Sequence, residues 1–421
     1  MLFREKFIAF FLTCFFSLSV CFTAGADDVV KLRTYLHPPY QLLDGKELTG
    51  TGVQAVRCVF TQMGHQYQIA LSPPNRNRYM FESGKIDGLF LSIPNSELSR
   101  SGIATEPLGL ERWKFFRLAV PLNISRKPVP DLDDRIGSVL GSNEGIWLTR
   151  RRFEKRAFSS DMKSLIKVLL NKRIDYALAD EAAFLQAAKE YDLSLDSVGS
   201  SFVRYVPLVA YFSRDFLAQN AGFMDQFNNQ IDLCPAGTKQ LTKPEKQRLS
   251  ELAKLFVSQR DLQRAITEQI AENRADKSQD DNKRQQDATW IEARKNKSQT
   301  ETLFMKFILG NDLSKKLNNL KQNSNGKISE VFVFDNRGYI LGLSQITSDY
   351  WQGDEEKYSR IFEDNEPMNF SHIQFDSSTR KFQVSVTIPV FNPDTGEKVA
   401  GITFGFDADI SLSDYPAMKP L

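Results

Sequence analysis

Two nearly identical phrases decide how this sequence folds: SGKIDGLFLS at residues 83–92 and NKRIDYALADE at residues 171–181. In each phrase a basic residue, Ile and Asp precede a short apolar run, which is typical of a buried strand that follows a polar helix end. We expect Asp87 and Asp175 to be structural, bonding backbone groups where the helix becomes a strand. The repetition predicts two units with the same local architecture.

The segments around each phrase alternate between strand and helix patterns. Runs of strand length are separated by segments in which apolar residues recur at helical spacing. The expected strands are 29–36, 66–71, 86–93, 135–141, 174–180 and 206–213, and the expected helices are 52–64, 75–84, 144–152, 161–172 and several up to 257. This order predicts an α/β fold with largely parallel sheets covered by helices.

The length and composition limit the classes of protein to which the chain can belong. With 421 residues it is too long for one core, which indicates two or three domains. An apolar fraction of 41% and a charged fraction of 25% are those of a globular protein, and a net charge of +2 argues against nucleic-acid binding. No Ser-His-Asp pattern, phosphate loop or metal motif occurs, so we expect neither catalysis nor a cofactor.

Residues 1–26 have the pattern of a signal peptide. Arg4 and Lys6 precede an apolar stretch at 7–22, and the small residues that follow it predict cleavage before Asp27. An uncleaved anchor is the alternative, but the apolar stretch is shorter than the ~20 residues of a comfortable membrane span. We therefore expect a periplasmic mature protein with no stable membrane insertion.

Export to an oxidising compartment makes a disulfide between the remaining cysteines more favourable. Cys14 and Cys21 lie in the signal peptide, which leaves Cys58 and Cys234 in the mature chain. An oxidising compartment favours one disulfide between these two, and two separately buried thiols are the alternative. The three histidines show no metal-ligand spacing, so no metal site is expected.

Four landmarks, in order, carry a resemblance to a known family. They are LHPPYQLLDGKELTGTGVQAV at 36–56, SGKIDGLFLSIPNSELSR at 83–100, VLGSNEGIW at 139–147 and NKRIDYALADEAAF at 171–184. With them the chain resembles the type II periplasmic solute-binding proteins, in particular the family-3 branch that binds amino acids and similar small polar solutes. The resemblance implies a domain of two lobes with the solute between them. Its expected bounds are 27–258, with lobe 1 at about 27–120 and 206–258 and lobe 2 at about 121–205.

The resemblance also implies which residues face the solute. Arg100 matches an arginine whose planar donors hold a solute carboxylate, and Asp180 matches an acid that receives the solute ammonium group. Tyr40 matches an aromatic that covers the apolar part of a ligand. The other expected contacts are Ser92, just past a strand end, and Ser142 and Asn143, at the start of a helix whose N–H groups can hold an anion.

Each of these residues also has a structural interpretation. Arg100 stands slightly farther from Asp87 than is usual in the family, so a surface position is the alternative. Asp180 can cap the helix that follows it, and Tyr40 can be an ordinary core aromatic. Asn75 stands where relatives often carry an aromatic, which indicates a more polar cleft wall.

The sequence changes character beyond residue 258. Residues 259–308 are charged and contain no Gly or Pro, which predicts a long helix. Residues 327–344 predict a hairpin, and 381–407 predict two further antiparallel strands. A helix followed by such a sheet resembles the Cache domain, a PAS-like periplasmic sensor fold, and gives an expected second domain at 259–421.

TSDYWQGDEEK, at 347–357, is the most characteristic segment of this second resemblance. In such domains one face of the sheet and the overlying loops hold a small ligand. Tyr350 and Trp351 are therefore candidate contacts, with plain packing as the alternative.

Together these features predict a periplasmic protein that captures a small polar solute and relays its presence to an inner-membrane receptor. The added domain favours this sensing role. The alternative is the substrate-binding component of an ABC-type amino-acid uptake system, which passes its solute to a permease and needs only the two lobes.

Overall fold

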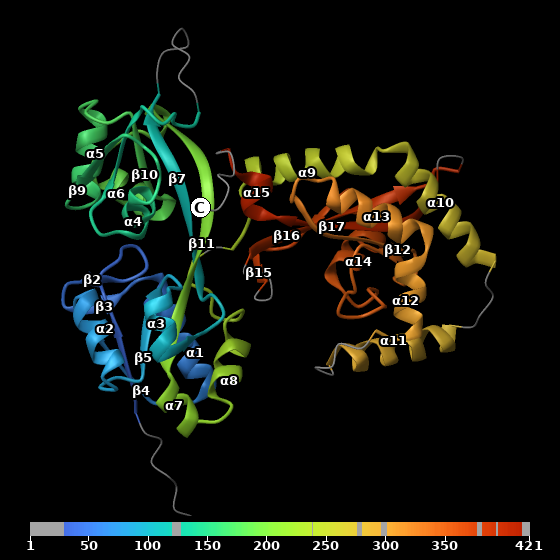
Figure 1. Ribbon diagram of the computed structural model, residues 1–421, viewed down its shortest axis with the longest axis horizontal. Helices are drawn as coiled ribbons and strands as arrows, with labels where there is room; N and C mark the ends of the chain where they lie inside the picture. Colours follow the sequence, from blue (N-terminus) through green and yellow to red (C-terminus); the bar gives the residue numbers. More distant parts are fainter. Residues whose placement is uncertain are drawn as a thin grey trace, which may run out of the picture.

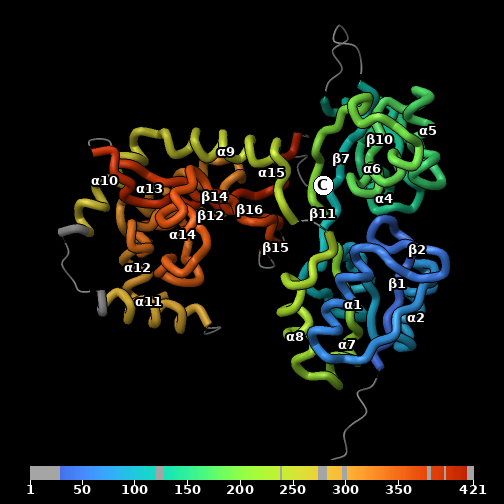
Figure 2. The backbone as a smooth tube through the Cα atoms, turned by 180° about the vertical axis from the view of Figure 1, so that it is seen from behind, coloured from blue at the N-terminus to red at the C-terminus, as the bar shows by residue number. Residues whose placement is uncertain are grey.

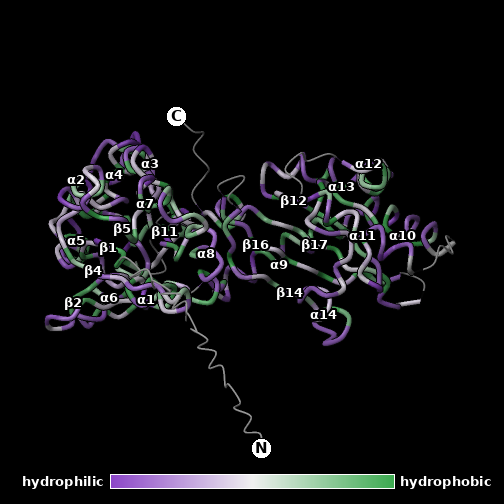
Figure 3. Tube along the Cα trace, turned by 90° about the horizontal axis from the view of Figure 1, so that it is seen from below, coloured by the Kyte–Doolittle hydropathy of each residue, from purple (hydrophilic) through white to green (hydrophobic). Residues whose placement is uncertain are grey.

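The computed structural model describes residues 29–119, 128–237, 239–275, 280–295, 301–376, 381–392 and 395–414, so the expected signal peptide lies outside the described residues. Two lobes form the N-terminal half, and a separate sheet with its own helices forms the C-terminal half (Figure 1, Figure 2). The two halves lie end to end along the long axis (Figure 3). The fold class is mixed α/β, as the sequence predicts.

Lobe 1 is built on a partly parallel sheet covered by helices, together with one small antiparallel hairpin. Its elements are β1 (Val30–Thr34), β2 (Leu42–Asp44), β3 (Glu47–Thr49), α1 (Thr51–Met63), β4 (Tyr67–Leu71), α2 (Pro74–Glu82), β5 (Gly88–Ser92), α3 (Ser96–Ser101), β6 (Gly102–Ala104), α7 (Arg214–Gln219) and α8 (Phe223–Gln230). β1 pairs in parallel with β4 on one side and β5 on the other. On α1, Val53, Val56 and Phe60 recur at helical spacing and are buried, which directs one face of this helix into the core.

Lobe 2 repeats this arrangement. Its elements are β8 (Arg135–Val139), α4 (Asn143–Thr149), β9 (Lys155–Ser159), α5 (Met162–Leu170), β10 (Tyr176–Asp180), α6 (Glu181–Glu190) and η1 (Leu195–Ser197). β8 pairs in parallel with β9 and with β10. The two similar units predicted from the repeated phrases are present, and β9 is a strand that the sequence did not predict.

The aspartates of the two repeated phrases have the same structural role. Asp87 Oδ2 accepts a hydrogen bond from the backbone N–H of Lys31 at 2.7 Å. Asp175 Oδ2 accepts one from the backbone N–H of Arg135 at 3.1 Å, and the same carboxylate pairs with the Arg135 guanidinium. Each carboxylate thus binds the first strand of its unit, which confirms the structural prediction.

Two long strands, β7 (Gly109–Leu118) and β11 (Val198–Ser213), connect the lobes. They pair antiparallel over most of their length, and β11 continues into lobe 1 beside β5, while β7 pairs with β10 of lobe 2. Nine of the described strands therefore belong to one sheet that crosses between the lobes. The sequence predicted only the second half of β11, because Gly and Ser at 199–201 have low strand propensity.

The C-terminal half is built on an antiparallel sheet in the order β13-β12-β17-β16-β14, with β15 paired to β16. Its strands are β12 (Ile328–Asp335), β13 (Ile340–Leu343), β14 (Asn369–Phe370), β15 (Gln374–Asp376), β16 (Lys381–Phe391) and β17 (Lys398–Asp407). Its helices are α9 (Lys243–Val257), α10 (Arg260–Ala275), α11 (Asp280–Lys295), α12 (Leu303–Gly310), α13 (Asp312–Gln322), α14 (Glu356–Phe362) and α15 (Ala408–Leu412). The pairings of β12 with β13 and of β16 with β17 confirm both predicted antiparallel pairs.

Both faces of this sheet are covered. On β12, Val331 and Val333 join a core that includes residues of α10 and α13, whereas Phe332 and Phe334 join a core that includes Trp290 of α11. The alternation follows from the two-residue period of a strand.

Two expectations about the C-terminal half differ from the structure. The described residues of 259–308 form α10, α11 and the start of α12, and α10 and α11 lie in different places around the sheet and not along one axis (Figure 1). α9, which the sequence assigned to lobe 1, packs Leu249 and Ala253 into the core of the C-terminal sheet. Both differences arise because the apolar residues of these helices are buried against strands that come much later in the chain.

A disulfide joins Cys58 of α1 to Cys234, the pairing that the sequence predicts, across a separation of 176 residues. The Cα atoms lie 5.7 Å apart. The bond links the early and late parts of lobe 1, because α8 packs beside α1. Lobe 2 lies within the closed loop but carries neither cysteine.

We expect the double variant Cys58→Ala/Cys234→Ala to lower the free energy of unfolding by about 2–5 kcal/mol, because the unfolded chain loses a long covalent loop. Urea unfolding of the mature protein under non-reducing conditions measures this. The same unfolding with a reducing agent is the control, since it should destabilise the wild type and leave the variant unchanged. Equal stability of the two proteins without reductant would contradict the expectation.

Candidate ligand-binding cleft

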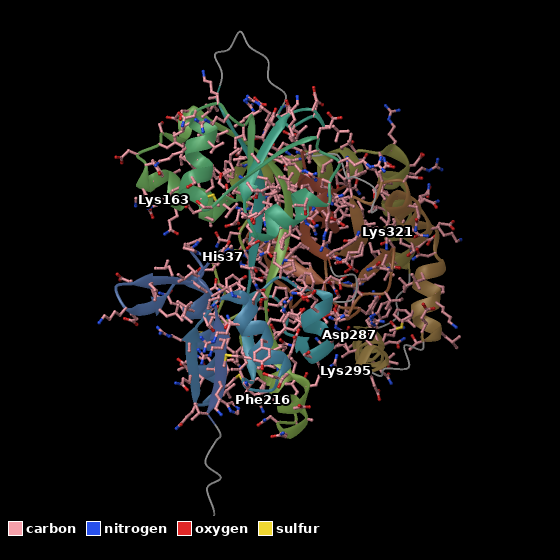
Figure 4. All side chains as sticks on the ribbon, turned by 60° about the vertical axis from the view of Figure 1, so that its left-hand side comes forward. His37, Lys163, Phe216, Asp287, Lys295 and Lys321 are labelled. Atoms are coloured by element: carbon pink, nitrogen blue, oxygen red, sulfur yellow. A yellow bond between two sulfur atoms is a disulfide. The ribbon has the colours of Figure 1, made fainter. Side chains whose placement is uncertain are left out.

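A cavity of about 820 Å³ lies between the two lobes. It is found beyond the carboxyl ends of β1 and β5, where open α/β sheets bind ligands. Lobe 1 lines it with residues around β1, α2, β5 and α3, and lobe 2 lines it with residues between Gly141 and Arg150. The hinge strands contribute Trp113 and Arg204. His37 stands at the junction of the lobes (Figure 4).

His37 forms a partly buried ion pair with Glu111 of β7. His37 Nε2 lies 2.7 Å from Glu111 Oε1, and Trp113 Nε1 donates to Glu111 Oε2 at 2.7 Å. Burial lowers the pKa of His37, but the hydrogen bond and the charge of Glu111 outweigh it and raise the pKa to about 9. The imidazole is therefore a cation at neutral pH, and both carboxylate oxygens of Glu111 already have a protein donor.

Asp180, at the end of β10, is the N-cap of α6 and is held by donors from the protein itself. Its Oδ1 accepts from the backbone N–H of Arg112 at 2.9 Å. Its Oδ2 accepts from the Tyr40 hydroxyl at 3.2 Å and from the backbone N–H of Ala183 at 3.1 Å. Burial raises the pKa of Asp180 to about 7, and the nearby charges of Glu111 and Glu144 add to the effect.

Glu144 of α4 completes this buried acidic group. Its Oε1 accepts from the backbone N–H of Asp180 at 2.8 Å, whereas its Oε2 is buried without a hydrogen-bond partner among the described residues. Burial raises the pKa of Glu144, and the charge of Glu111 raises it further. The raised pKa makes the neutral form of Glu144 more favourable than in water, which reduces repulsion among the three nearby acids.

Arginines dominate the charge of the cavity wall. They are Arg33 of β1, Arg78 of α2, Arg150 just after α4, and Arg204 of β11. Glu97 is the one acidic residue among the described residues that line the cavity, and it pairs with Arg78. The surface that a solute meets is therefore electropositive, while the acids lie behind it.

The residues predicted to contact a solute are divided between the cavity wall and the layer behind it. Ser92, Ser142 and Asn143 line the cavity, as does Asn75. Tyr40 and Asp180 are 4% and 0% exposed and are bonded to each other, so they lie behind the wall.

Arg100, the expected carboxylate ligand, lies elsewhere. It is exposed in the last turn of α3, and its backbone carbonyl accepts from Arg214 Nε at 3.3 Å. It is not among the residues that line the cavity. The alternative surface position therefore describes Arg100, since residues 96–98 at the start of α3 line the cavity whereas its last turn does not.

The candidate contacts in the C-terminal half have packing roles. Tyr350 is 3% exposed and lies against Trp290 and Phe304. Trp351 Nε1 donates to the backbone carbonyl of Arg337 at 2.9 Å. Asp287 of α11, labelled in Figure 4, accepts hydrogen bonds from the backbone N–H groups of both residues. These contacts attach the segment 347–357 to α11.

His37, Glu111, Glu144 and the four arginines of the wall were not predicted from the sequence. Two of these residues could have been predicted from their position beside predicted site residues, since His37 precedes Tyr40 in HPPY and Glu144 directly follows Asn143. Glu111 had a weaker signal, a carboxylate within an otherwise aromatic and basic strand. The arginines had none, because they come from four separate segments.

Among the described residues, no helix combines the length and hydrophobicity needed to span a membrane. Within the same part of the chain, no group of three or more His, Cys, Asp and Glu residues is arranged to hold a metal ion.

Comparisons with protein-family models and with curated protein sequences find no match. Among solved structures, a histidine kinase sensor domain with similarity to periplasmic binding proteins is 15% identical over 49% of this chain and 90% of its own, with a TM-score of 0.40. The GluR0 ligand-binding core from Nostoc punctiforme in complex with L-glutamate is 15% identical over 48% and 92%, with a TM-score of 0.39. An ancestral arginine-binding protein bound to arginine is 15% identical over 49% and 91%, with a TM-score of 0.38.

We expect Asp180→Asn to weaken the pH dependence of stability. The pKa of Asp180 lies near 7 in the folded protein and near 4 in the unfolded chain, so ionisation is less favourable when folded. The free energy of unfolding of the wild type should therefore fall as pH rises from about 4 to about 7. Asn keeps the helix cap but does not ionise, so the fall between pH 5 and pH 8 should be smaller by about 1–3 kcal/mol.

Urea unfolding at the two pH values measures the difference. Asp161→Asn is the matched control, because Asp161 caps α5 in an exposed position and backbone hydrogen bonds lower its pKa. The contribution of Asp161 to the free energy of unfolding is already complete above pH 5, so it should not change between pH 5 and pH 8. An Asp180→Asn profile parallel to that of the wild type would contradict the expectation.

Proposed function

We propose that this chain is an exported solute receptor, in which the two lobes enclose a small polar solute and the C-terminal domain passes the state of the cleft to an inner-membrane partner. The observation that carries the proposal is that the C-terminal domain touches both the cleft and the hinge. We assign the solute-binding domain to about 27–240 and the C-terminal domain to the remainder, because α9 packs on the C-terminal sheet.

The first point of contact is the cavity itself. Phe375 of β15 lines the cavity together with Arg204, Val206 and Pro207 of β11. A residue from the C-terminal domain thus forms part of the wall that a solute would approach. Movement of either lobe relative to β11 would change the surroundings of Phe375.

The second point of contact is the hinge strand. The backbone N–H of Tyr205 donates to Asp409 Oδ1 at 2.7 Å, and the backbone N–H of Phe202 donates to Asp414 Oδ2 at 3.1 Å. The Tyr205 hydroxyl donates to Glu245 Oε1 of α9 at 2.7 Å. Because β11 also carries the connection between the lobes, a change in hinge geometry would act directly on α15 and α9.

Apolar packing strengthens this attachment. Leu110 of β7 and Phe202 and Tyr205 of β11 belong to the same core as the C-terminal strands, and the ring of Tyr205 contacts that of Phe382. A domain attached by a flexible linker would not share a core with the hinge. The packing supports a receptor in which cleft and C-terminal domain move together.

The alternative is a substrate-binding component of an ABC-type uptake system. That role needs a cleft and an exposed surface for a permease, and it gives no reason for a further domain packed on the hinge. The contacts at Phe375 and Asp409 therefore favour sensing over uptake.

We expect a solute to stabilise the mature protein and to close the lobes. A thermal-shift panel of common L-amino acids, small dicarboxylates, sugar phosphates and sugars identifies a stabilising compound, which adds about 2.7 kcal/mol at 100 times its Kd. Small-angle scattering with that compound should give a smaller radius of gyration than the free protein. A folded protein that no compound in the panel stabilises would contradict a solute-receptor function.

The coupling has its own test. With the stabilising compound, we expect hydrogen exchange to change in β15 and α15 as well as in the cleft, because these elements touch the wall and the hinge. Phe375→Ala should reduce the change in β15. Phe391→Ala is the control, since Phe391 is 54% exposed at the end of β16 and does not line the cavity.

Exchange that changes in the two lobes alone, with β15 and α15 unaffected, would support the uptake component instead.

A further inference from the structure

We propose that the cleft binds a small organic dianion, held between Arg33 and Arg78 of lobe 1 and Arg150 of lobe 2. The inference rests on the proposed function, since it names the class of solute that the same cleft takes. It replaces the amino acid expected from the sequence with a solute that needs no ammonium group.

The cavity wall has a surplus of positive charge available to a ligand. Arg78 is paired with Glu97, and Arg204 lies 3.9 Å from Asp409 on the side of the C-terminal domain. Arg33 and Arg150 form no ion pair within the described part of the chain. One arginine with uncommitted donors therefore stands on each lobe, and a guanidinium presents the planar donor pair that suits a carboxylate or phosphate oxygen.

Among the described residues, the one acid that lines the cavity, Glu97, already pairs with Arg78, and the other acids of the cleft are not placed to receive an ammonium group. Glu111 already accepts hydrogen bonds from His37 and Trp113, and Asp180 accepts three from within the protein. Glu144 is 3% exposed and does not line the cavity. An ammonium in this cavity would lose water and meet guanidinium groups, which is unfavourable on both counts.

The position of the arginines also suggests how such a solute would close the cleft. Bringing Arg150 of lobe 2 toward Arg33 of lobe 1 places two positive charges near each other, which opposes closure of the empty cleft. A solute with two acidic groups can bind one arginine on each lobe and convert this repulsion into attraction. Two negative charges, rather than one, are needed to neutralise both.

Calorimetry with four small probes tests the charge class directly. Succinate and glycerol 3-phosphate are the dianions, of carboxylate and phosphate chemistry respectively, aspartate is of similar size to succinate but carries an ammonium, and 1,4-diaminobutane is the dication. We expect one of the two dianions to bind at least about tenfold more tightly than aspartate and diaminobutane. The reason is that one hydrogen bond to a charged group changes affinity by about tenfold or more. Which dianion binds distinguishes the two acid chemistries.

Variants connect the binding to the arginines. Arg33→Gln and Arg150→Gln should each weaken the binding of that dianion by at least about tenfold. Arg76→Gln is the matched control, because Arg76 is an exposed residue of α2 that does not line the cavity, and it should bind like the wild type. Circular dichroism of each variant shows that it is folded.

The outcomes separate this inference from the proposed function. Three outcomes would overturn the inference but leave the proposed solute receptor. The first is that aspartate or diaminobutane binds as tightly as both dianions. The second is that Arg33→Gln and Arg150→Gln leave dianion binding unchanged, and the third is that only uncharged or cationic compounds stabilise the protein. If no probe binds and no compound of the stabilisation panel has an effect, both fail.

Discussion

The antiparallel ladder between β7 and β11 is the constraint on which the rest of the structure depends. β7 pairs with β10 of lobe 2, and β11 continues past the ladder to pair with β5 of lobe 1. Because one continuous sheet passes through both lobes, their relative motion must occur as bending or twisting of these two strands. The cleft lies beside this hinge, and Trp113 of β7 and Arg204 of β11 form part of its wall.

The same strands also receive the C-terminal domain. Tyr205 is the clearest example, since its backbone N–H is bound by Asp409, its hydroxyl by Glu245 and its ring by Phe382. Burial raises the pKa of Asp409 to about 6, so the charge at this contact changes within a pH unit or so of neutrality. Cleft, hinge and C-terminal sheet form a continuous set of contacts, which is the physical basis of the proposed receptor function.

Within the cleft, charge is arranged in two layers. The acids Glu111, Glu144 and Asp180 lie inside, where His37, backbone N–H groups and Tyr40 satisfy most of their oxygens. The arginines form the outer layer that faces the cavity. Three buried acids and one cation would be costly if all were ionised, and the raised pKa values of Glu144 and Asp180 indicate how this cost is reduced. The buried acids taken alone would predict an ammonium group in the cleft, whereas the arginines that face the cavity favour an anion.

The sequence by itself determined what depends on local pattern. The repeated phrases located two α/β units and the structural roles of Asp87 and Asp175, and the hairpin patterns located β12, β13, β16 and β17 of the C-terminal sheet but not β14 and β15. Two remaining cysteines in an expected oxidising compartment were enough to anticipate their pairing. Ser92, Ser142 and Asn143 could be placed because residues at strand ends and helix starts meet at the same edge of a sheet.

Only the tertiary structure decided which long-range partners each segment meets. The charged stretch 259–308 had the periodicity of one helix, but its apolar residues are buried against strands that come later in the chain, and its described residues form separate helices around the sheet. Arg100 fitted a family pattern, yet it is exposed in the last turn of α3, while Arg33, Arg78 and Arg150 converge on the cavity from three separate segments. The sequence pattern of a segment reveals whether it is helix or strand, but not which other segments it packs against. The packing decides which side chains face the cavity, and therefore which charge a solute meets.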